Sequence, residues 1–325
     1  MQTVLMYALF VVGLVIIVKG GDWFVDSAAW IADASGIPKF IVGATIVSFA
    51  TTLPEMIVSS IAAAEGKVAM ACGNAVGSVT ANIALIMAIS ILFMPMVINR
   101  KSYIAKTVLM LSAITFLLIF SFDGELKVIE CTPILVVFIA FIIENIRSAK
   151  KETVSKDERP EINGKIIAKN IILLILGIAG IVIGSNLLVE NGSAIARSLG
   201  VSEAVISLTA IAIGTSLPEL VTTVSAIIKK VPSLSVGNII GANIIDMTLI
   251  LPISSIISGG SIGGAEFLQT ARVDLPVCLL VGIIALVPAL IAGKFRRWQG
   301  VALIACYAAY LAVIMLIDMG TIVLA

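Results

Sequence analysis

The short stretch Thr51-Thr52-Leu53-Pro54-Glu55 occurs a second time in this chain, as Thr215-Ser216-Leu217-Pro218-Glu219. A second motif follows each copy, because Gly73-Asn74 through Asn82 is matched by Gly237-Asn238 through Asp246. Both pairs are 164 positions apart (55 to 219, 82 to 246), so the copies align without a gap. An ungapped repeat of this extent indicates an internal duplication, with one proline–glutamate motif in each half.

The rest of the chain is strongly apolar. Of its 325 residues, 60% are hydrophobic and 13% are charged, and the mean hydropathy is +1.16. This composition argues against a soluble domain, and continuous apolar runs argue against a membrane β-barrel. Since a spanning helix needs roughly 20 apolar residues, there is room for about ten spans. The apolar runs predict them near 3–30, 39–64, 68–97, 104–121, 130–146, 168–197, 204–228, 234–258, 274–293 and 298–320.

A charged segment divides the predicted spans into five and five. Residues 147–166 are interpreted as a solvated linker, which leaves a first five-helix repeat at 1–146 and a second at 167–325. Because an odd number of spans separates the copies, equivalent residues enter the membrane from opposite sides. The predicted fold is therefore an all-α integral membrane protein of about ten transmembrane helices in two inverted five-helix repeats.

The positions of lysine and arginine predict the orientation of the chain. If the N-terminus lies outside, most of the 21 lysines and arginines fall in cytoplasmic loops, which retain positive charge. We therefore expect a multi-pass protein of the cell membrane, with both termini extracellular and the linker cytoplasmic.

Glu55 and Glu219 carry the chemistry of the two motifs. Each lies inside a predicted apolar span, where a charge is costly. The preceding Pro54 or Pro218 lacks an N–H and is expected to free carbonyl oxygens about one turn upstream. Freed carbonyls that line a protected cavity are ligands for hard cations. For either motif alone, the alternative is a proline kink that serves only helix packing. The duplication of the proline–glutamate motif favours a binding role.

The span after each motif adds neutral oxygens and one more acid. These residues are Asn74, Ser78 and Asn82 in the first half, and Asn238, Asn243 and Asp246 in the second. An all-oxygen site with several carboxylates selects Ca2+, Na+ or similar hard ions over zinc or copper. The chain has no histidine, and its four cysteines lie far apart without disulfide or zinc-ligand spacing.

The motifs TTLPE and GTSLPE, with GNAVGSVTAN and GNIIGANIID, resemble the two alpha-repeats of the calcium/cation antiporter superfamily, and most closely those of prokaryotic sodium/calcium exchangers. The resemblance spans nearly the whole chain. It implies ten helices, of which helices 2, 3, 7 and 8 form the core and helices 1 and 6 are long sliding elements. It also implies a Ca2+ site with sodium positions around it.

The ligands implied by the resemblance fall into two sets. The Ca2+ ligands are the carboxylates of Glu55 and Glu219 and the backbone oxygens of Thr51 and Thr215. The sodium positions use Thr52, Ser78, Asn82, Ser216 and Asp246, with the carbonyls of Ser48 and Ala212. The chain departs from the family pattern at Thr52, where serine is usual, and at Ala242, where many members have a hydroxyl. The missing hydroxyl at Ala242 removes one of the ligands that the resemblance implies for the outermost sodium position.

We expect a secondary active antiporter, and not an enzyme, that exchanges Ca2+ for Na+ by alternating access. A Ca2+/H+ antiporter using the same paired glutamates is the alternative, although proton-coupled relatives usually have Asn-Ala before glutamate, where this chain has Leu-Pro. The expected partners are Ca2+, Na+ (or H+) and the lipid bilayer, with no cofactor, nucleotide or nucleic acid. The sequence does not indicate an oligomeric state.

Three other classes fit the sequence less well. Pro288-Ala289-Leu290 resembles an element of intramembrane aspartyl proteases, but that chemistry needs two deep aspartates and only Asp246 is expected to lie deep. An ATP-driven pump is disfavoured because no Gly-Lys pair is followed by serine or threonine. A channel would use the same oxygens, but inverted repeats favour a carrier.

Overall fold

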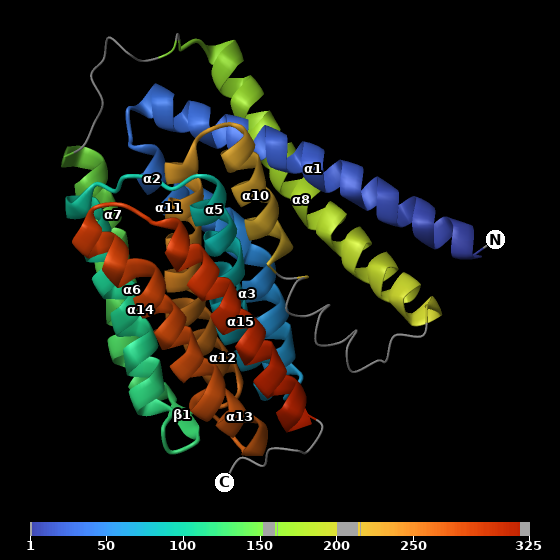
Figure 1. Cartoon of the computed structure of the whole chain (residues 1–325), viewed down its shortest axis with the longest axis vertical. Helices are drawn as coiled ribbons and strands as arrows, with labels where there is room; N and C mark the ends of the chain where they lie inside the picture. The colour runs from blue at the N-terminus through green and yellow to red at the C-terminus, as the bar shows by residue number, and fades with distance from the viewer. Residues whose placement is uncertain (1, 152–159, 161, 200–213, 215, 319–325) are drawn as a thin grey trace. The chain divides into compact units, whose positions relative to one another are not determined.

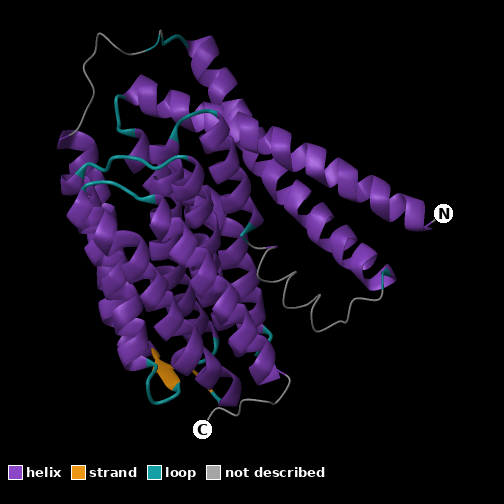
Figure 2. Cartoon of the chain, viewed as in Figure 1, coloured by secondary structure: helices purple, strands orange, loops and turns teal. Residues whose placement is uncertain are grey.

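The structure is a computed structural model that describes residues 2–151, 160, 162–199, 214 and 216–318 (Figure 1). The described chain is almost entirely helical, apart from two short strands (Figure 2). Within these ranges nine helices are long and apolar enough to cross a membrane. They are Val4–Ser35, Lys39–Ala64, Met70–Phe93, Arg100–Phe120, Val128–Lys150, Gly164–Ser198, Pro232–Ile257, Phe267–Ala292 and Arg297–Ile317. The predicted all-α membrane fold is confirmed.

Two of the predicted spans need comment. Of the span expected near 204–228, only the apolar helix α10 (Leu217–Ile228) is described, and residues 204–213 and 215 lie outside the described residues. The span expected at 274–293 begins earlier, at Phe267. Asp274 therefore lies inside a span and is 4% exposed. The expectation that Asp246 is the only deep aspartate was wrong, because the polar pair Arg272 and Asp274 concealed the start of this helix.

The chain forms two compact units. Unit 1 comprises Met1–Pro54 and Ala149–Asn238, and unit 2 comprises Glu55–Ser148 and Ile239–Ala325. The three boundaries fall within α3 (Ser48–Ala64), near the end of α7 (Cys131–Lys151) and within α11 (Pro232–Ile245). Each unit contains segments of both sequence halves. The two units therefore do not coincide with the two five-helix repeats predicted at 1–146 and 167–325. Those repeats remain a prediction from the sequence.

Unit 1 is built on two long helices, α1 (Gln2–Ser35) and α8 (Gly164–Ser198), which lie side by side (Figure 1). A Cβ atom added to Gly20 would lie 2.8 Å from the Ile181 backbone nitrogen, and one on Gly184 would lie 2.6 Å from that of Ile17. Glycine therefore permits this close approach, as is common where membrane helices pack. The remaining elements are α2 (Lys39–Val42), the π-helical η1 (Gly43–Val47), the start of α3, α10 and the start of α11.

Unit 2 contains the ends of α3 and α11 and most of the other helices. These are α4 (Val68–Ala81), η2 (Asn82–Met87), α5 (Ala88–Phe93), α6 (Arg100–Phe120), η3 (Val128–Glu130), α7 (Cys131–Lys151, to Ser148), η5 (Asp246–Ile250), α12 (Leu251–Ile257), α13 (Ala265–Gln269), η6 (Thr270–Asp274), α14 (Leu275–Ala292) and α15 (Arg297–Asp318). Two strands, β1 (Glu125–Lys127) and β2 (Ser261–Gly263), pair antiparallel with Leu126 opposite Ile262, and are orange in Figure 2.

Four helical segments of the described chain have wide, π-helical turns. η2 begins at Asn82 and η5 begins at Asp246, which are equivalent positions of the duplication. η1 ends immediately before Ser48, and η6 ends at Asp274. Because π-helical turns often occur at functional sites, their positions direct attention to these four residues.

Candidate functional site

In unit 1 the central acid is Glu219, which is 1% exposed. It lies in the first turn of α10, directly after Pro218. Its Oε2 atom has no hydrogen-bond partner among the described residues, and the Thr51 hydroxyl lies within hydrogen-bonding range of the carboxylate. The two proline motifs differ locally, because Pro54 lies inside α3 whereas Pro218 stands at the beginning of α10, where a missing N–H is tolerated.

A chain of hydrogen bonds connects three segments of unit 1 around Glu219. Thr51 Oγ1 donates to Asn238 Oδ1 at 3.2 Å, and Asn238 Nδ2 donates to Thr222 Oγ1 at 3.1 Å. Thr222 Oγ1 in turn donates to the Glu219 backbone oxygen at 3.0 Å. The Thr51 hydroxyl also lies 3.3 Å from the Ser48 carbonyl oxygen, and its single proton serves one acceptor at a time. The start of α3 and the start of α11 thus both support the Glu219 turn.

Two further predicted ligands of unit 1 are buried hydroxyls. Thr52 is 0% exposed and Ser216 is 3% exposed, and neither hydroxyl has a hydrogen-bond partner among the described residues. A buried polar atom without a partner costs free energy, so such oxygens indicate a place where an ion or water binds. The predicted ligands Thr215 and Ala212 lie outside the described residues.

In unit 2 the corresponding acid is Glu55, which is also 1% exposed. Asn74, near the start of the next span, donates from Nδ2 to Ser59 Oγ at 2.9 Å and lies 3.5 Å from the Glu55 backbone oxygen. Ser59 Oγ donates to the Ala71 carbonyl oxygen at 3.3 Å. These bonds fasten α4 to the part of α3 that follows Glu55.

The remaining predicted ligands of unit 2 lie on α4, η2 and η5. Asn82 Nδ2 donates to Asn243 Oδ1 at 3.2 Å, and the Asn82 Oδ1 atom has no hydrogen-bond partner among the described residues. Asp246 and Ser78 are 1% and 2% exposed. Ala242, where a hydroxyl was expected from the family pattern, is completely buried. Unit 2 therefore brings an amide oxygen and carboxylates into its core.

Both units repeat one local arrangement. Asn74 binds Ser59, four residues after Glu55, and the equivalent Asn238 binds Thr222, three residues after Glu219. Reasoning from the motifs missed Ser59 and Thr222. Their spacing was a usable signal, because residues three and four apart lie on one face of a helix. Each glutamate helix is therefore held by an asparagine from the span that follows it.

Three other acids of unit 1 are not among the predicted ligands. Asp26 pairs with Lys229 at 2.7 Å, and Asp33 pairs with Lys39 at 3.1 Å, in both cases with partly exposed side chains. Glu190, on α8, is also exposed. Their exposure distinguishes these three acids from the buried Glu219.

The donor sets have a common chemistry. Each unit buries carboxylate oxygens together with hydroxyl or amide oxygens, and this combination suits hard cations. In the part of the chain that the structure describes, no three acids, cysteines or histidines gather as a transition-metal centre would require. Buried acids in the spans of a polytopic helical protein mark ion pathways. The fold and these residues define a membrane protein that transports cations.

Comparisons with known proteins give the family. The family model described as sodium/calcium exchanger protein matches residues 5–146 and 169–316. The chain therefore belongs to the sodium/calcium exchanger family, which consists of transporters rather than enzymes, and its general activity is cation exchange. The match covers both sequence halves and omits the whole charged linker, 147–166.

Individual relatives agree with this assignment. The sodium/calcium exchanger MaX1 of Methanosarcina acetivorans is 31% identical, over 95% of this chain and 98% of the relative. The inner membrane protein YrbG of Escherichia coli is 34% identical, over 85% of this chain and 86% of the relative. Among solved structures, the sodium-calcium exchanger NCX_Mj soaked with Na+ and Sr2+ superimposes with a TM-score of 0.82 at 27% identity, over 95% of this chain and 99% of that chain. This match supports the fold of two inverted repeats.

Proposed function

We propose that this protein is a secondary active antiporter that exchanges Ca2+ for Na+ by alternating access. The observation that carries the proposal is the duplicated arrangement of a buried glutamate held by an asparagine from the following span. The names of MaX1 and NCX_Mj as sodium/calcium exchangers support the choice of ions.

In this proposal Glu55 and Glu219 bind Ca2+. A divalent ion that loses its water in a membrane needs formal negative charge as well as oxygen ligands, and these two buried carboxylates supply it. The backbone oxygens of Thr51 and Thr215 complete the Ca2+ ligands. The backbone oxygen of each glutamate already accepts a side-chain hydrogen bond, from Thr222 at Glu219 and from Asn74 at Glu55, so little reordering of the backbone is needed on binding.

Sodium ions use mainly neutral oxygens. The proposed ligands are Thr52, Ser78, Asn82, Ser216 and Asp246, with the carbonyls of Ser48 and Ala212. The buried hydroxyls of Thr52 and Ser216 and the Asn82 Oδ1 atom lack partners among the described residues, which is consistent with a ligand role. Hydroxyl and amide groups do not gain or lose a proton near neutral pH, so they suit Na+ rather than H+ as the coupling ion.

The test is a flux measurement in proteoliposomes of the whole chain. Vesicles are loaded with Na+, diluted into Na+-free medium at the same pH, and assayed for uptake of Ca2+. We expect the outward Na+ gradient to drive uptake, and a K+ gradient or a pH gradient alone to fail. Uptake driven by a pH gradient and not by Na+ would replace this proposal with a Ca2+/H+ antiporter that uses the same glutamates.

A further inference from the structure

Asp274 is a buried acid that the proposed exchange site does not use. It ends η6, at the start of α14, and lies within the span Phe267–Ala292 with an exposure of 4%. The equivalent position of the first half is Met110, 164 residues earlier, so Asp274 is not part of the duplicated ligand set. An ionisable side chain at this depth is costly and indicates a function.

The described partners of Asp274 are neutral. The Tyr310 hydroxyl, on α15, donates to Asp274 Oδ1 at 3.0 Å, and the Thr270 hydroxyl lies within hydrogen-bonding range. Within the described residues no lysine or arginine forms an ion pair with Asp274; the neighbouring Arg272 is exposed. On α6, Arg100 binds the Ile291 carbonyl oxygen at the other end of α14, and Lys106 is completely buried. A carboxyl group in these surroundings is well suited to gain and lose a proton.

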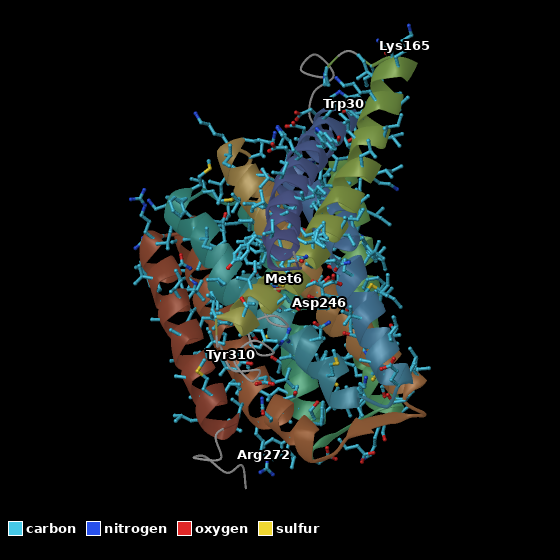
Figure 3. All side chains as sticks on the ribbon, turned by 90° about the vertical axis from the view of Figure 1, so that its right-hand side faces the viewer. Met6, Trp30, Lys165, Asp246, Arg272 and Tyr310 are labelled. Atoms are coloured by element: carbon cyan, nitrogen blue, oxygen red, sulfur yellow. The ribbon has the colours of Figure 1, made fainter. Side chains whose placement is uncertain are left out.

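Asp274 and Asp246 share a neighbour, Cys278. The three residues belong to unit 2. Cys278, one turn further along α14, lies near both acids and within hydrogen-bonding range of Thr80. Thr80 stands on α4 between Ser78 and Asn82. In Figure 3, Tyr310 lies between the level of Asp246 and that of Arg272.

The titratable groups around Asp274 are therefore few. The groups that interact with Asp274, directly or through a shared neighbour, are Asp246 on η5, Cys278 on α14, and Tyr307 and Tyr310 on α15. Of these, only Asp246 is another carboxylic acid. The buried Lys106 of α6, a helix that packs against α14 and η5, adds a basic group to this region. A change of charge at Asp274 therefore acts on the Asp246 carboxylate in the presence of Lys106.

The backbone provides an independent sign of function at Asp274. Among the described residues, π-helical turns occur next to Ser48, at Asn82, at Asp246 and at Asp274. The first three positions are proposed ligands of the transported ions. The fourth repeats the same backbone distortion at a residue with no proposed role in cation binding.

We propose that Asp274 is a proton-binding site of the exchanger, distinct from the cation-binding carboxylates, and that its protonation is coupled to cation binding at Asp246. The inference rests on the proposed function for the identity of the cation. An ionised Asp274 adds negative potential near Asp246 and favours a bound cation there, whereas a proton removes that contribution. The coupling is reciprocal: protonation of Asp274 lowers the affinity for the cation at Asp246, and a bound cation lowers the affinity of Asp274 for the proton by the same factor.

The first experiment compares Asp274→Asn with the wild-type protein in proteoliposomes. The Na+ concentration for half-maximal exchange is measured in mildly alkaline and mildly acid buffers, with equal pH on both sides. For the wild type we expect this Na+ concentration to rise by about fivefold on acidification, which is typical of the coupling between two binding sites. Asp274→Asn should lose most of this change. Asp123→Asn, which removes an exposed acid of unit 2 outside the spans, is the matched control and should retain it.

The second experiment detects the proton directly and does not depend on transport. Infrared difference spectroscopy on acidification should show a buried carboxyl band in the wild type that is missing in Asp274→Asn. In Tyr310→Phe the band should persist but appear at higher pH, because the anion loses a hydrogen-bond donor. This variant keeps the charge and volume of the site, so it also serves if Asp274→Asn does not fold. A band and a pH profile unchanged in both variants would overturn the inference, whereas failure of Na+ to drive Ca2+ in the wild type would overturn only the proposed function.

Discussion

At the scale of single residues, the two glutamates are each held by their own helix and by an asparagine from the next span. Asn238 reaches Thr222, whose hydroxyl binds the Glu219 carbonyl, and Asn74 reaches Ser59 beyond Glu55. The backbone of each acid is therefore fixed by neutral hydrogen bonds. Replacing a carboxylate by its amide should leave these bonds intact, which allows the charge to be tested separately from the fold.

We predict that Glu219→Gln, and likewise Glu55→Gln, abolishes Ca2+ transport without unfolding the protein. Losing one partner of a buried charge interaction costs about 3 kcal/mol of binding free energy, which corresponds to roughly a hundredfold loss of affinity. The measurement is Ca2+ uptake together with the thermal midpoint in detergent. Glu190→Gln, an exposed change on α8, is the matched control and should transport normally. Near-normal uptake in either site variant would disprove the assignment of Ca2+ ligands.

A second residue-scale prediction concerns Ala242, which is buried where many relatives have a hydroxyl. Ala242→Ser should lower the Na+ concentration needed for half-maximal exchange, because it adds a neutral oxygen to the sodium ligands. The readout is the Na+ dependence of Ca2+ flux. Ala75→Ser, at another fully buried alanine of unit 2, controls for the cost of burying a hydroxyl and should not change that dependence. An equal shift in both variants would count against a sodium position at Ala242.

At the scale of elements, α1 and α8 contact each other along glycine faces. Gly184→Ala places a methyl group against the Ile17 backbone, where an added Cβ would lie 2.6 Å from its nitrogen. We expect a destabilisation of about 1–3 kcal/mol, as is usual for overpacking, seen as a lower thermal midpoint. Gly164→Ala, at the start of the same helix, meets no atom within 4 Å and should leave the midpoint unchanged or slightly raised. Equal midpoints for the two variants would contradict the close packing of α1 on α8.

At the scale of the whole molecule, the distribution of positive charge leads to a prediction of orientation. Single cysteines introduced at Lys151 and at Asp123, in a background without the four native cysteines, should be labelled from opposite sides of the membrane. Lys151 should react from the cytoplasm and Asp123 from outside. The measurement uses a membrane-impermeant thiol reagent on sealed cells and on inverted vesicles. Labelling of both positions from the same side would remove the basis for inverted halves.

The sequence by itself determined the class of fold and the central acids. Hydropathy is a local property that the length of an apolar run reveals. The nine spans found in the described residues were therefore predicted within a few residues, except at the helix start near Asp274, and the span expected at 204–228 stays a prediction. The duplication was visible because both copies kept their motifs at one offset. Burial of Glu55, Glu219, Asn82 and Asp246 followed from their positions inside apolar runs, and the structure confirms it.

The tertiary structure alone decided which side chains meet. The bond between Thr51 and Asn238 joins residues 187 positions apart, and that between Tyr310 and Asp274 joins α15 to the start of α14. The two compact units also cut across the sequence halves, at Pro54 in α3 and at Asn238 in α11. The physical reason is that periodicity shows which residues share a face of one helix, whereas contacts between helices depend on how each is rotated and packed against its neighbours.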